Sequence, residues 1–504
     1  MSLLTEDVAK PEPACRKPLR SARPPVFATQ MQEIIFVFSI SMSQFITEFF
    51  VSAFTLILPT LIKELAIPQA SSVWPASAFS LAIASTLLIF GRLGDMFGGY
   101  WIFLGGLAWL LLWSVLAGFS INPIMLNICR ALQGLGAAAF LPTGVMLMGS
   151  IYEPGPRKNM AFAIYGTSAV FGFLGGIVVA GVVGQFLRWG FYFWIGGILT
   201  ALTLIFSIFS VPASFRKPST PGNVKMDYAG AAGIVLGLGL TIFAITQSAH
   251  ASAGWKTPYI PATFTVGILC LIFTVYTGSR NESNALLPMG LFKIPSMTPM
   301  LGAIFLLYGT WGIYSVYGTL FFQNIMLASP LQVVAWYAPL GIAGLIFSIL
   351  EGYILHLVPG RILLVVSGLG AVGSQLLLAL TPLENASYWA WILPAMILST
   401  IGIDVSTILM TVFITTALPP EQQGLAGGVM NSVLQLGVAF VLGVADIVQS
   451  ATVAEEGLGE SYKKTFWFGV GIASVSLGVM ALWGRVPKAT SREDENAKGE
   501  GEQC

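Results

Sequence analysis

The sequence predicts an all-α membrane protein with fourteen transmembrane helices, and three observations lead to this fold class. Apolar residues make up 55% of the chain and charged residues 9%, whereas an ordinary soluble domain has about 25% charged residues. Long stretches, such as 101–129, 159–187 and 294–350, contain no Asp, Glu, Lys or Arg. Each exceeds the roughly 20 residues that cross a hydrocarbon core. The polar linkers that would separate soluble domains are missing, so hydrocarbon is the main solvent of this chain.

The expected helices follow from the breaks in the apolar stretches, where charged residues or Pro, Gly and Asn gather. They are 33–58, 72–92, 100–119, 123–150, 159–184, 189–211, 228–247, 259–278, 297–322, 331–355, 361–381, 388–416, 423–449 and 463–484. An even number of crossings places both tails on one side of the membrane. Lys and Arg are concentrated on that side, which predicts cytoplasmic tails under the positive-inside rule. We therefore expect a multi-pass protein of the cell membrane, with the vacuolar membrane as an alternative.

The chain divides into two halves around a polar linker. The expected segments are a cytoplasmic tail (1–32), a six-helix half (33–211), a cytoplasmic linker (212–227), two additional helices (228–278), a second six-helix half (279–484) and a second cytoplasmic tail (485–504). A short internal similarity between residues 91–99 and 352–360 fits a repeat offset by eight helices. Internal repeats of this kind are common in transporters.

Several classes of function are excluded by composition. The net charge of +1 gives no reason to expect nucleic acid as a partner. The four cysteines, Cys15, Cys129, Cys270 and Cys504, are far apart, so we expect neither a disulfide nor a metal site. No phosphate-binding loop is present, which argues against ATP as the energy source. We expect no enzyme activity and no cofactor.

A glycine-rich turn with one acidic residue follows the second expected helix. It contains Gly91, Asp95 and Gly98, and local sequence alone also permits a plain loop. The spacing resembles Gly-x-Leu-x-Asp-x-x-Gly, the signature of the major facilitator superfamily. This resemblance implies the major facilitator fold, in which the aspartate helps to latch the two halves on the cytoplasmic side. Met96 and Gly99 stand where the superfamily usually has basic residues, which implies a weaker latch or other partners.

Arg130 lies inside the fourth expected helix, where a guanidinium is costly unless it faces a wet cavity or a carboxylate. The alternative is that it extends from a helix end to the membrane surface. The pattern Arg-x-x-x-Gly-x-Gly at 130–136 resembles a second motif of the superfamily, which is associated there with proton coupling. Arg130 is therefore a candidate for proton coupling.

Glycines recur along the fifth expected helix, among them Gly172 and Gly176, and they allow close helix packing. The run is similar to the glycine motif of antiporters of the superfamily, although Phe173 stands where that motif has proline. Further matches resemble the fourteen-span drug:proton antiporter branch in its fungal form, over residues 34–484. The resemblance favours export over uptake.

Four carboxylates lie within apolar stretches, where a carboxylate tends to gain a proton or a partner. Glu48 and Asp404 are deep and are our candidates for proton coupling, whereas Glu351 and Asp446 are close enough to helix ends to reach water. Gln44 precedes Glu48 by one helical turn, so the two side chains can share a cavity. With Gln44, two further polar residues of the thirteenth helix, Asn431 and Gln435, are the candidates for the cargo cavity.

The expected function is proton-coupled export of a small amphipathic organic molecule, such as a drug, a toxin or a fungal secondary metabolite, by alternating access. The expected partners are this cargo, protons and the lipid bilayer, with the protein acting as a monomer and the proton gradient as its energy source. An uptake carrier of the same fold, for a siderophore or a nutrient, is the first alternative, and a channel is the second. Asn385 begins an Asn-Ala-Ser sequon on the outward side and is a glycosylation candidate.

Overall fold

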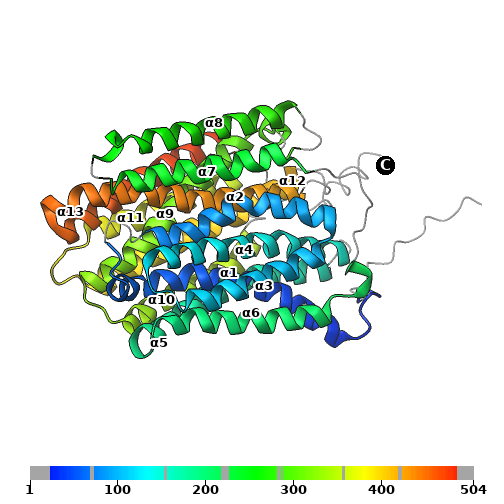
Figure 1. Cartoon of the computed structure of the whole chain (residues 1–504). Coiled ribbons are helices and arrows are strands. Elements are labelled where there is room, and N and C mark those ends of the chain that lie inside the picture. Colours follow the sequence, from blue (N-terminus) through cyan, green and yellow to red (C-terminus); the bar gives the residue numbers. More distant parts are fainter. Residues whose placement is uncertain are drawn as a thin grey trace, which may run out of the picture.

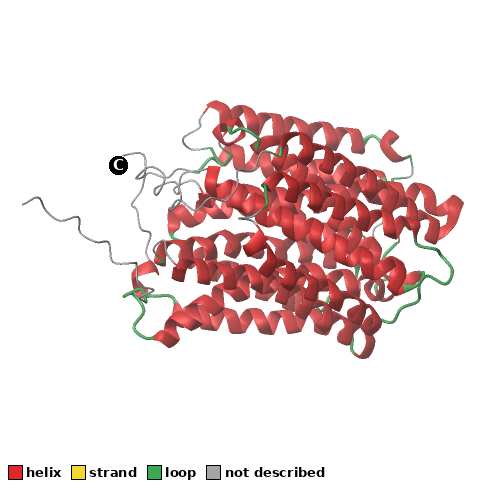
Figure 2. Cartoon of the chain, turned by 180° about the vertical axis from the view of Figure 1, so that it is seen from behind, coloured by secondary structure: helices red, strands yellow, loops and turns green. Residues whose placement is uncertain are grey.

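The computed structural model describes residues 23–68, 73–152, 156–216, 226–251, 253–280, 285–287, 289–354, 358–417 and 423–484. Within these ranges the regular elements are all helical (Figure 2). They are α1 (Gln30–Glu64), α2 (Trp74–Phe97), α3 (Gly99–Ala117), α4 (Pro123–Ile151), α5 (Pro156–Phe186), α6 (Gly190–Ser210), η2 (Ala213–Arg216), α7 (Tyr228–Ser248), η3 (Gly254–Lys256), α8 (Tyr259–Arg280), η4 (Met289–Lys293), α9 (Met297–Asn324), α10 (Pro330–Ile354), α11 (Gly360–Leu380), η5 (Tyr388–Ile392), α12 (Leu393–Ala417) and α13 (Gln423–Trp483).

Thirteen of the described helices are long and apolar enough to cross a membrane. The last of them, α13, has 61 residues, and a straight helix of that length would measure about 90 Å, three times the hydrocarbon thickness of about 30 Å. The chain turns within α13 at Gly457, whose φ of 80° and ψ of 172° are not helical. Each part of α13 then crosses once, and the predicted fourteen-helix membrane protein is confirmed.

The last two expected helices leave a gap at residues 450–462, and the prediction that the helix is interrupted over this whole gap is wrong. The structure continues the helix as far as Gly457 and resumes it directly afterwards. This segment contains the strong helix formers Ala and Glu. Lys463 pairs with Glu460 one turn away on the same helix, whereas Lys464 pairs with Glu456 across the turn at Gly457. Apolarity marks where a helix leaves the membrane but does not mark where the helix ends.

Two groups of helices share one contact pattern. In the first, α1 contacts α5, α2 contacts α4, and α3 contacts α4 and α6; in the second, α9 contacts α13, α10 contacts α12, and α11 contacts α12 and α13. We call the group α1–α6 the N-terminal half and the group α9–α13 the C-terminal half. The same pattern of helix contacts therefore occurs twice in the described chain.

The two halves meet along two seams, where α2 contacts α13 and α5 contacts α10. On the first seam, a Cβ atom at Gly428 would lie 3.2 Å from Leu88. The additional helices lie beside this seam, with α7 next to α2 and α13, and α8 at the edge of the bundle (Figure 1). Because α8 is the least buried of the candidate membrane helices, we expect lipid to be its main surrounding.

The described chain begins and ends at the same end of the bundle (Figure 1). We call this end the tail side and the opposite end, where α13 turns, the kink side. Helices begin at recognisable caps: Thr29 accepts from the Gln32 backbone N–H at 3.1 Å, Asn122 from Met125 at 2.8 Å and Asp227 from Gly230 at 2.8 Å. The predicted tail 485–504, residues 1–22 of the other tail and residues 217–225 of the linker lie outside the described residues.

An ion pair fastens α1 to α5 on the tail side. Arg157 donates from Nε and Nη2 to the two carboxylate oxygens of Glu33 at 2.7 and 2.6 Å, and the Tyr152 hydroxyl donates to the same carboxylate at 2.9 Å. The hydrogen bond with Glu33 raises the pKa of Arg157, and burial next to Glu33 raises the pKa of Tyr152. Both groups therefore keep their protons at neutral pH, and the cluster holds the tail ends of the two helices together.

Candidate functional site

The glycines of α5 bring its backbone against α1. A Cβ atom at Gly172 would overlap the carbonyl oxygen of Phe45, and one at Gly176 would lie 2.9 Å from the carbonyl oxygen of Phe49. The Ser52 hydroxyl donates to the Phe173 carbonyl at 3.1 Å across the same contact. The predicted packing role of Gly172 and Gly176 is therefore visible, and it fixes the face of α1 that carries Gln44 and Glu48.

The C-terminal half repeats this close approach. A Cβ atom at Gly437 of α13 would overlap the carbonyl oxygen of Phe305 on α9, as Gly172 does with Phe45. One helical turn further along, the close approach is made by a glycine of α9 instead, because a Cβ atom at Gly309 would overlap the side chain of Val441 on α13. In this register Tyr308 of α9 occupies the position that Glu48 occupies on α1.

Two candidate residues of the N-terminal half lie beside one tyrosine. Tyr165 of α5 donates from its hydroxyl to Gln44 Oε1 at 3.0 Å and also interacts electrostatically with Glu48. Glu48 is half-buried and has no ion pair among the described residues. An uncompensated carboxylate inside a membrane protein is a site where a proton or a cation can bind.

The second candidate carboxylate, Asp404, belongs to the C-terminal half. Asp404 of α12 is half-buried, and its Oδ2 would lie 3.2 Å from a Cβ atom at Gly344 of α10. Tyr308 interacts electrostatically with both Asp404 and Glu48, and its hydroxyl lies 2.7 Å from the hydroxyl of Thr407. Tyr308 therefore lies within electrostatic range of two carboxylates that belong to different halves.

Arg130 is fully enclosed, with 1% of its surface exposed. It donates to the carbonyl oxygens of Pro75 at 3.1 Å and Phe50 at 3.0 Å and to Gln133 Oε1 at 3.3 Å. The rings of Phe54 and Phe79 lie 4.3 and 4.4 Å from its guanidinium carbon. The interior position is found. Carbonyl oxygens, an amide oxygen and aromatic faces surround the guanidinium, where the sequence left a wet cavity or a carboxylate open, and Glu48 is not among its partners in the described chain.

The motif with Gly91, Asp95 and Gly98 lies at the tail-side end of α2. Gly91 packs 3.7 Å from Pro142 of α4, counted from the position that its Cβ atom would take. Gly98 has a φ of 92° and joins α2 to α3, a conformation that glycine adopts without strain. The Asp95 side chain is exposed in the last turn of α2 and interacts with Arg92.

The remaining cargo candidates lie on the first part of α13. Asn431 is exposed and donates to Gly427 O of its own helix at 3.0 Å, and Gln435 is half-buried. Within the described part of the chain, no hydrogen bond joins either amide to Gln44 or Glu48. A common cavity that includes Asn431 and Gln435 stays a prediction.

The halves are joined on the kink side of these carboxylates. Gln323 of α9 donates to Leu56 O of α1 at 2.9 Å, and Gln185 of α5 accepts from the backbone N–H of Leu331 at 3.3 Å. Phe173 of α5 packs against Trp311 of α9 and Tyr337 of α10, with ring centroids 5.7 and 6.3 Å apart. This inter-half aromatic cluster links α5 to α9 and α10. Phe173 is the residue that replaces the usual proline of the glycine motif.

Sequence reasoning missed Tyr165 and Tyr308, since single tyrosines in apolar helices have no distinguishing pattern.

The expectation that Asp446 reaches water is wrong. Asp446 is 1% exposed, and its Oδ2 lies 2.9 Å from Nε2 of His250, a residue that the sequence did not single out. The side chain of Glu351 lies outside the described residues. Asn385 is exposed in the kink-side loop before η5 with a φ of 54°, which asparagine tolerates well.

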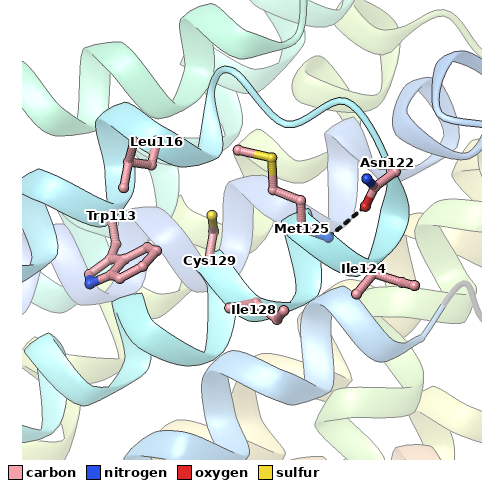
Figure 3. Close-up of a pocket in the computed structure, with 7 residues that line it drawn as sticks. All are labelled: Trp113, Leu116, Asn122, Ile124, Met125, Ile128 and Cys129. Carbon is pink, nitrogen blue, oxygen red and sulfur yellow. Dashed lines mark hydrogen bonds between the residues drawn. The ribbon is translucent and has the colours of Figure 1, made fainter.

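A shallow apolar depression lies between α3 and α4, away from these carboxylates (Figure 3). Ile124 and Ile128 on its rim are strongly exposed, and Asn122 uses its side chain to cap α4. An exposed apolar surface on a membrane helix is ordinary lipid-facing surface, so the depression is not the candidate site.

Comparison with known proteins places this geometry in a family. The chain is 33% identical over 433 residues to the low affinity ammonium transporter of Saccharomyces cerevisiae, covering 84% of this chain and 83% of that protein. It is 30% identical over 454 residues to the efflux pump terJ of Aspergillus terreus, covering 88% and 86%. The fold of a peptide transporter solved with sulfate superposes with a TM-score of 0.65 at 15% identity, over 90% of this chain and 96% of that one. The model of the Major Facilitator Superfamily matches residues 40–442, and the chain belongs to this family of membrane transporters.

Proposed function

We propose that the protein is a proton-coupled efflux transporter that exports a small amphipathic organic molecule by alternating access. The halves move relative to each other about the region between α1, α5, α9 and α12, and a proton taken from outside drives export. Relatives that are efflux pumps support the direction of transport, with terJ at 30% identity.

The observation that carries this proposal is the arrangement of Glu48 and Asp404. They belong to different halves, both are half-buried without an ion pair in the described chain, and both interact with Tyr308. When the halves separate on one side, the surroundings of both carboxylates change together. Protonation and cargo binding can then compete for the same acidic groups, which is the requirement for antiport.

Transport in proteoliposomes tests this proposal. Purified protein is reconstituted with pyranine inside the vesicles, and ethidium and rhodamine 6G serve as amphipathic probes. Antiport predicts that an outward probe gradient drives protons inward and that dissipation of the pH gradient with a protonophore stops uphill probe movement. Probe movement that is unchanged by the protonophore would contradict proton coupling and favour a channel.

Uptake is the second candidate, because the relative with 33% identity is an ammonium transporter. Labelled methylammonium distinguishes the two functions. Accumulation of methylammonium into intact cells, without exclusion of ethidium or rhodamine 6G, would support the uptake carrier and reject export.

The proposed setting of this activity is the cell membrane, with both tails in the cytoplasm and the protein acting as a monomer. The kink side then faces outward and carries Asn385, which we propose as a glycosylation site. A mobility shift after endoglycosidase treatment that disappears in Asn385→Gln would support this site and the orientation. A reporter fused to the C-terminus that is reactive only outside the cell would reject the orientation.

A further inference from the structure

The additional helices do not stand apart from the transporter core. α7 contacts both α2 of the N-terminal half and α13 of the C-terminal half, so it covers the seam between them (Figure 1). α8 packs mainly on α7. When the halves move, α7 can remain fixed to only one of them, and its contacts differ in kind on the two sides.

Polar and close contacts attach α7 to the C-terminal half. His250, two residues beyond α7, lies with Nε2 2.9 Å from Asp446 Oδ2, and the two side chains are 7% and 1% exposed. Tyr317 of α9 interacts with the same carboxylate. Beside this pair, a Cβ atom at Gly443 would lie 2.7 Å from Thr246 Oγ1, so α7 and α13 nearly touch. Separating a buried histidine and carboxylate leaves each without its partner in a low dielectric, which is costly.

A second attachment lies on the tail side. A Cβ atom at Gly278 of α8 would lie 3.2 Å from the carbonyl oxygen of Leu287, in the segment that leads through η4 into α9. Leu286 of the same segment is buried in a cluster with Ala231 and Ile234 of α7. Both ends of the additional pair are thus fastened to elements of the C-terminal half.

The contacts of α7 with α2 that the structure shows are apolar. The rings of Phe243 and Trp74 have centroids 6.0 Å apart, and Ile89 of α2 packs on the cluster that contains Ile234. Apolar contacts are non-directional, so one such surface can shift along another without breaking a hydrogen bond.

We infer that α7 and α8 move as part of the C-terminal half, attached through His250 and Asp446, while α2 slides along α7. This inference rests on the proposed alternating access. It gives the additional helices a role, which is to shield one seam from lipid during the movement without restricting it.

Distances between spin labels test the inference in the full-length protein in lipid nanodiscs, with the four native cysteines replaced by serine. Exposed kink-side positions receive labels in pairs: Trp255→Cys between α7 and α8, Ile121→Cys in the N-terminal half and Glu384→Cys in the C-terminal half. Distances are compared at pH 5.5 and pH 8. We expect the 121–384 and 121–255 distributions to shift together, and the 255–384 distribution to keep its mean.

The outcomes separate this inference from the proposed function. A 121–384 distance that never changes would contradict alternating access and, with it, the inference. If the 121–384 and 255–384 distances change while the 121–255 distance stays constant, α7 and α8 move with the N-terminal half. That result would overturn this inference and leave the proposed function standing. His250→Ala and, independently, Asp446→Asn should broaden the 255–384 distribution; an unchanged width in both variants would show that this pair is not the attachment.

Discussion

Single polar side chains in this protein differ in how their charge is compensated. Arg130 is enclosed by carbonyl oxygens and aromatic rings, and Glu33 has a guanidinium and a phenol as partners. Glu48 and Asp404 have no such compensation in the described chain. A compensated group contributes to stability, whereas an uncompensated one is available for binding.

The first prediction concerns these two carboxylates. Glu48→Gln and Asp404→Asn should each reduce proton-driven transport at least tenfold, because the amide cannot release a proton, while exchange of labelled for unlabelled cargo continues. Transport under a pH gradient and exchange without one are measured in the same vesicles. Glu384→Gln, in an exposed loop, is the control and should behave as the parent protein. Full driven transport in both variants would reject their role.

The second prediction concerns Arg130. Arg130→Lys keeps the charge but cannot reproduce a planar set of donors to Pro75 O, Phe50 O and Gln133, so we expect a loss of about 1–3 kcal/mol of stability. Arg130→Ala should reach the membrane but lose transport. Thermal unfolding in detergent, followed by size-exclusion chromatography, measures the first effect. Arg188→Lys, at an exposed position, serves as the control. A melting temperature equal to the parent's in Arg130→Lys would show that these contacts are unimportant.

At the scale of helices, close approach between backbones decides which faces point inward. Gly172 faces Phe45 and Gly437 faces Phe305, one contact in each half. Without a hydrophobic driving force between helices in lipid, small residues and dispersion contacts supply the specificity of packing. The positions of Gln44 and Glu48 therefore depend on glycines of another helix.

The third prediction follows from this contact. Gly172→Leu should separate α1 from α5 and lower both the yield of folded protein and its melting temperature strongly, because backbone atoms of Phe45 cannot move aside as a side chain can. Gly166→Ala is the matched control on the same helix, since a Cβ atom there meets nothing within 4 Å. The control should be neutral or slightly stabilising. Equal yields of the two variants would contradict the proposed packing.

At the scale of the whole molecule, the two halves are joined on the kink side by Phe173, Trp311 and Tyr337 and by two hydrogen bonds. Aromatic rings from different halves contribute roughly 0.5–1.5 kcal/mol per pair beyond their buried area. We expect this link to act as a closure of the kink side, because its strength is enough to hold the halves together and small enough to be broken when they separate.

The fourth prediction tests this closure. Phe173→Ala should increase severalfold the rate at which a membrane-impermeant thiol reagent, added from the kink side, labels a cysteine placed at Tyr308. Phe171→Ala is the control, because Phe171 lies two residues away on α5 and is exposed. Labelling rates that do not differ between the two variants would remove Phe173 from the closure.

The sequence by itself determined that the protein is a fourteen-helix membrane protein of this superfamily. The reason is physical: charge is excluded from hydrocarbon, and a backbone in lipid must satisfy its own hydrogen bonds, so apolar length and charge position predict crossings. Two motifs with the spacing of the superfamily, at residues 91–98 and 130–136, identified the family. The interior position of Arg130 was also predictable from its apolar neighbours.

Only the tertiary structure decided which side chains meet. Three features were not predictable: the electrostatic interaction of Tyr308 with Glu48 and Asp404, the carbonyl partners of Arg130, and the burial of Asp446 against His250. A helix that is apolar all round carries almost no periodic signal of its inward face. In lipid that face is chosen by close packing between distant segments, which no single segment of the sequence contains.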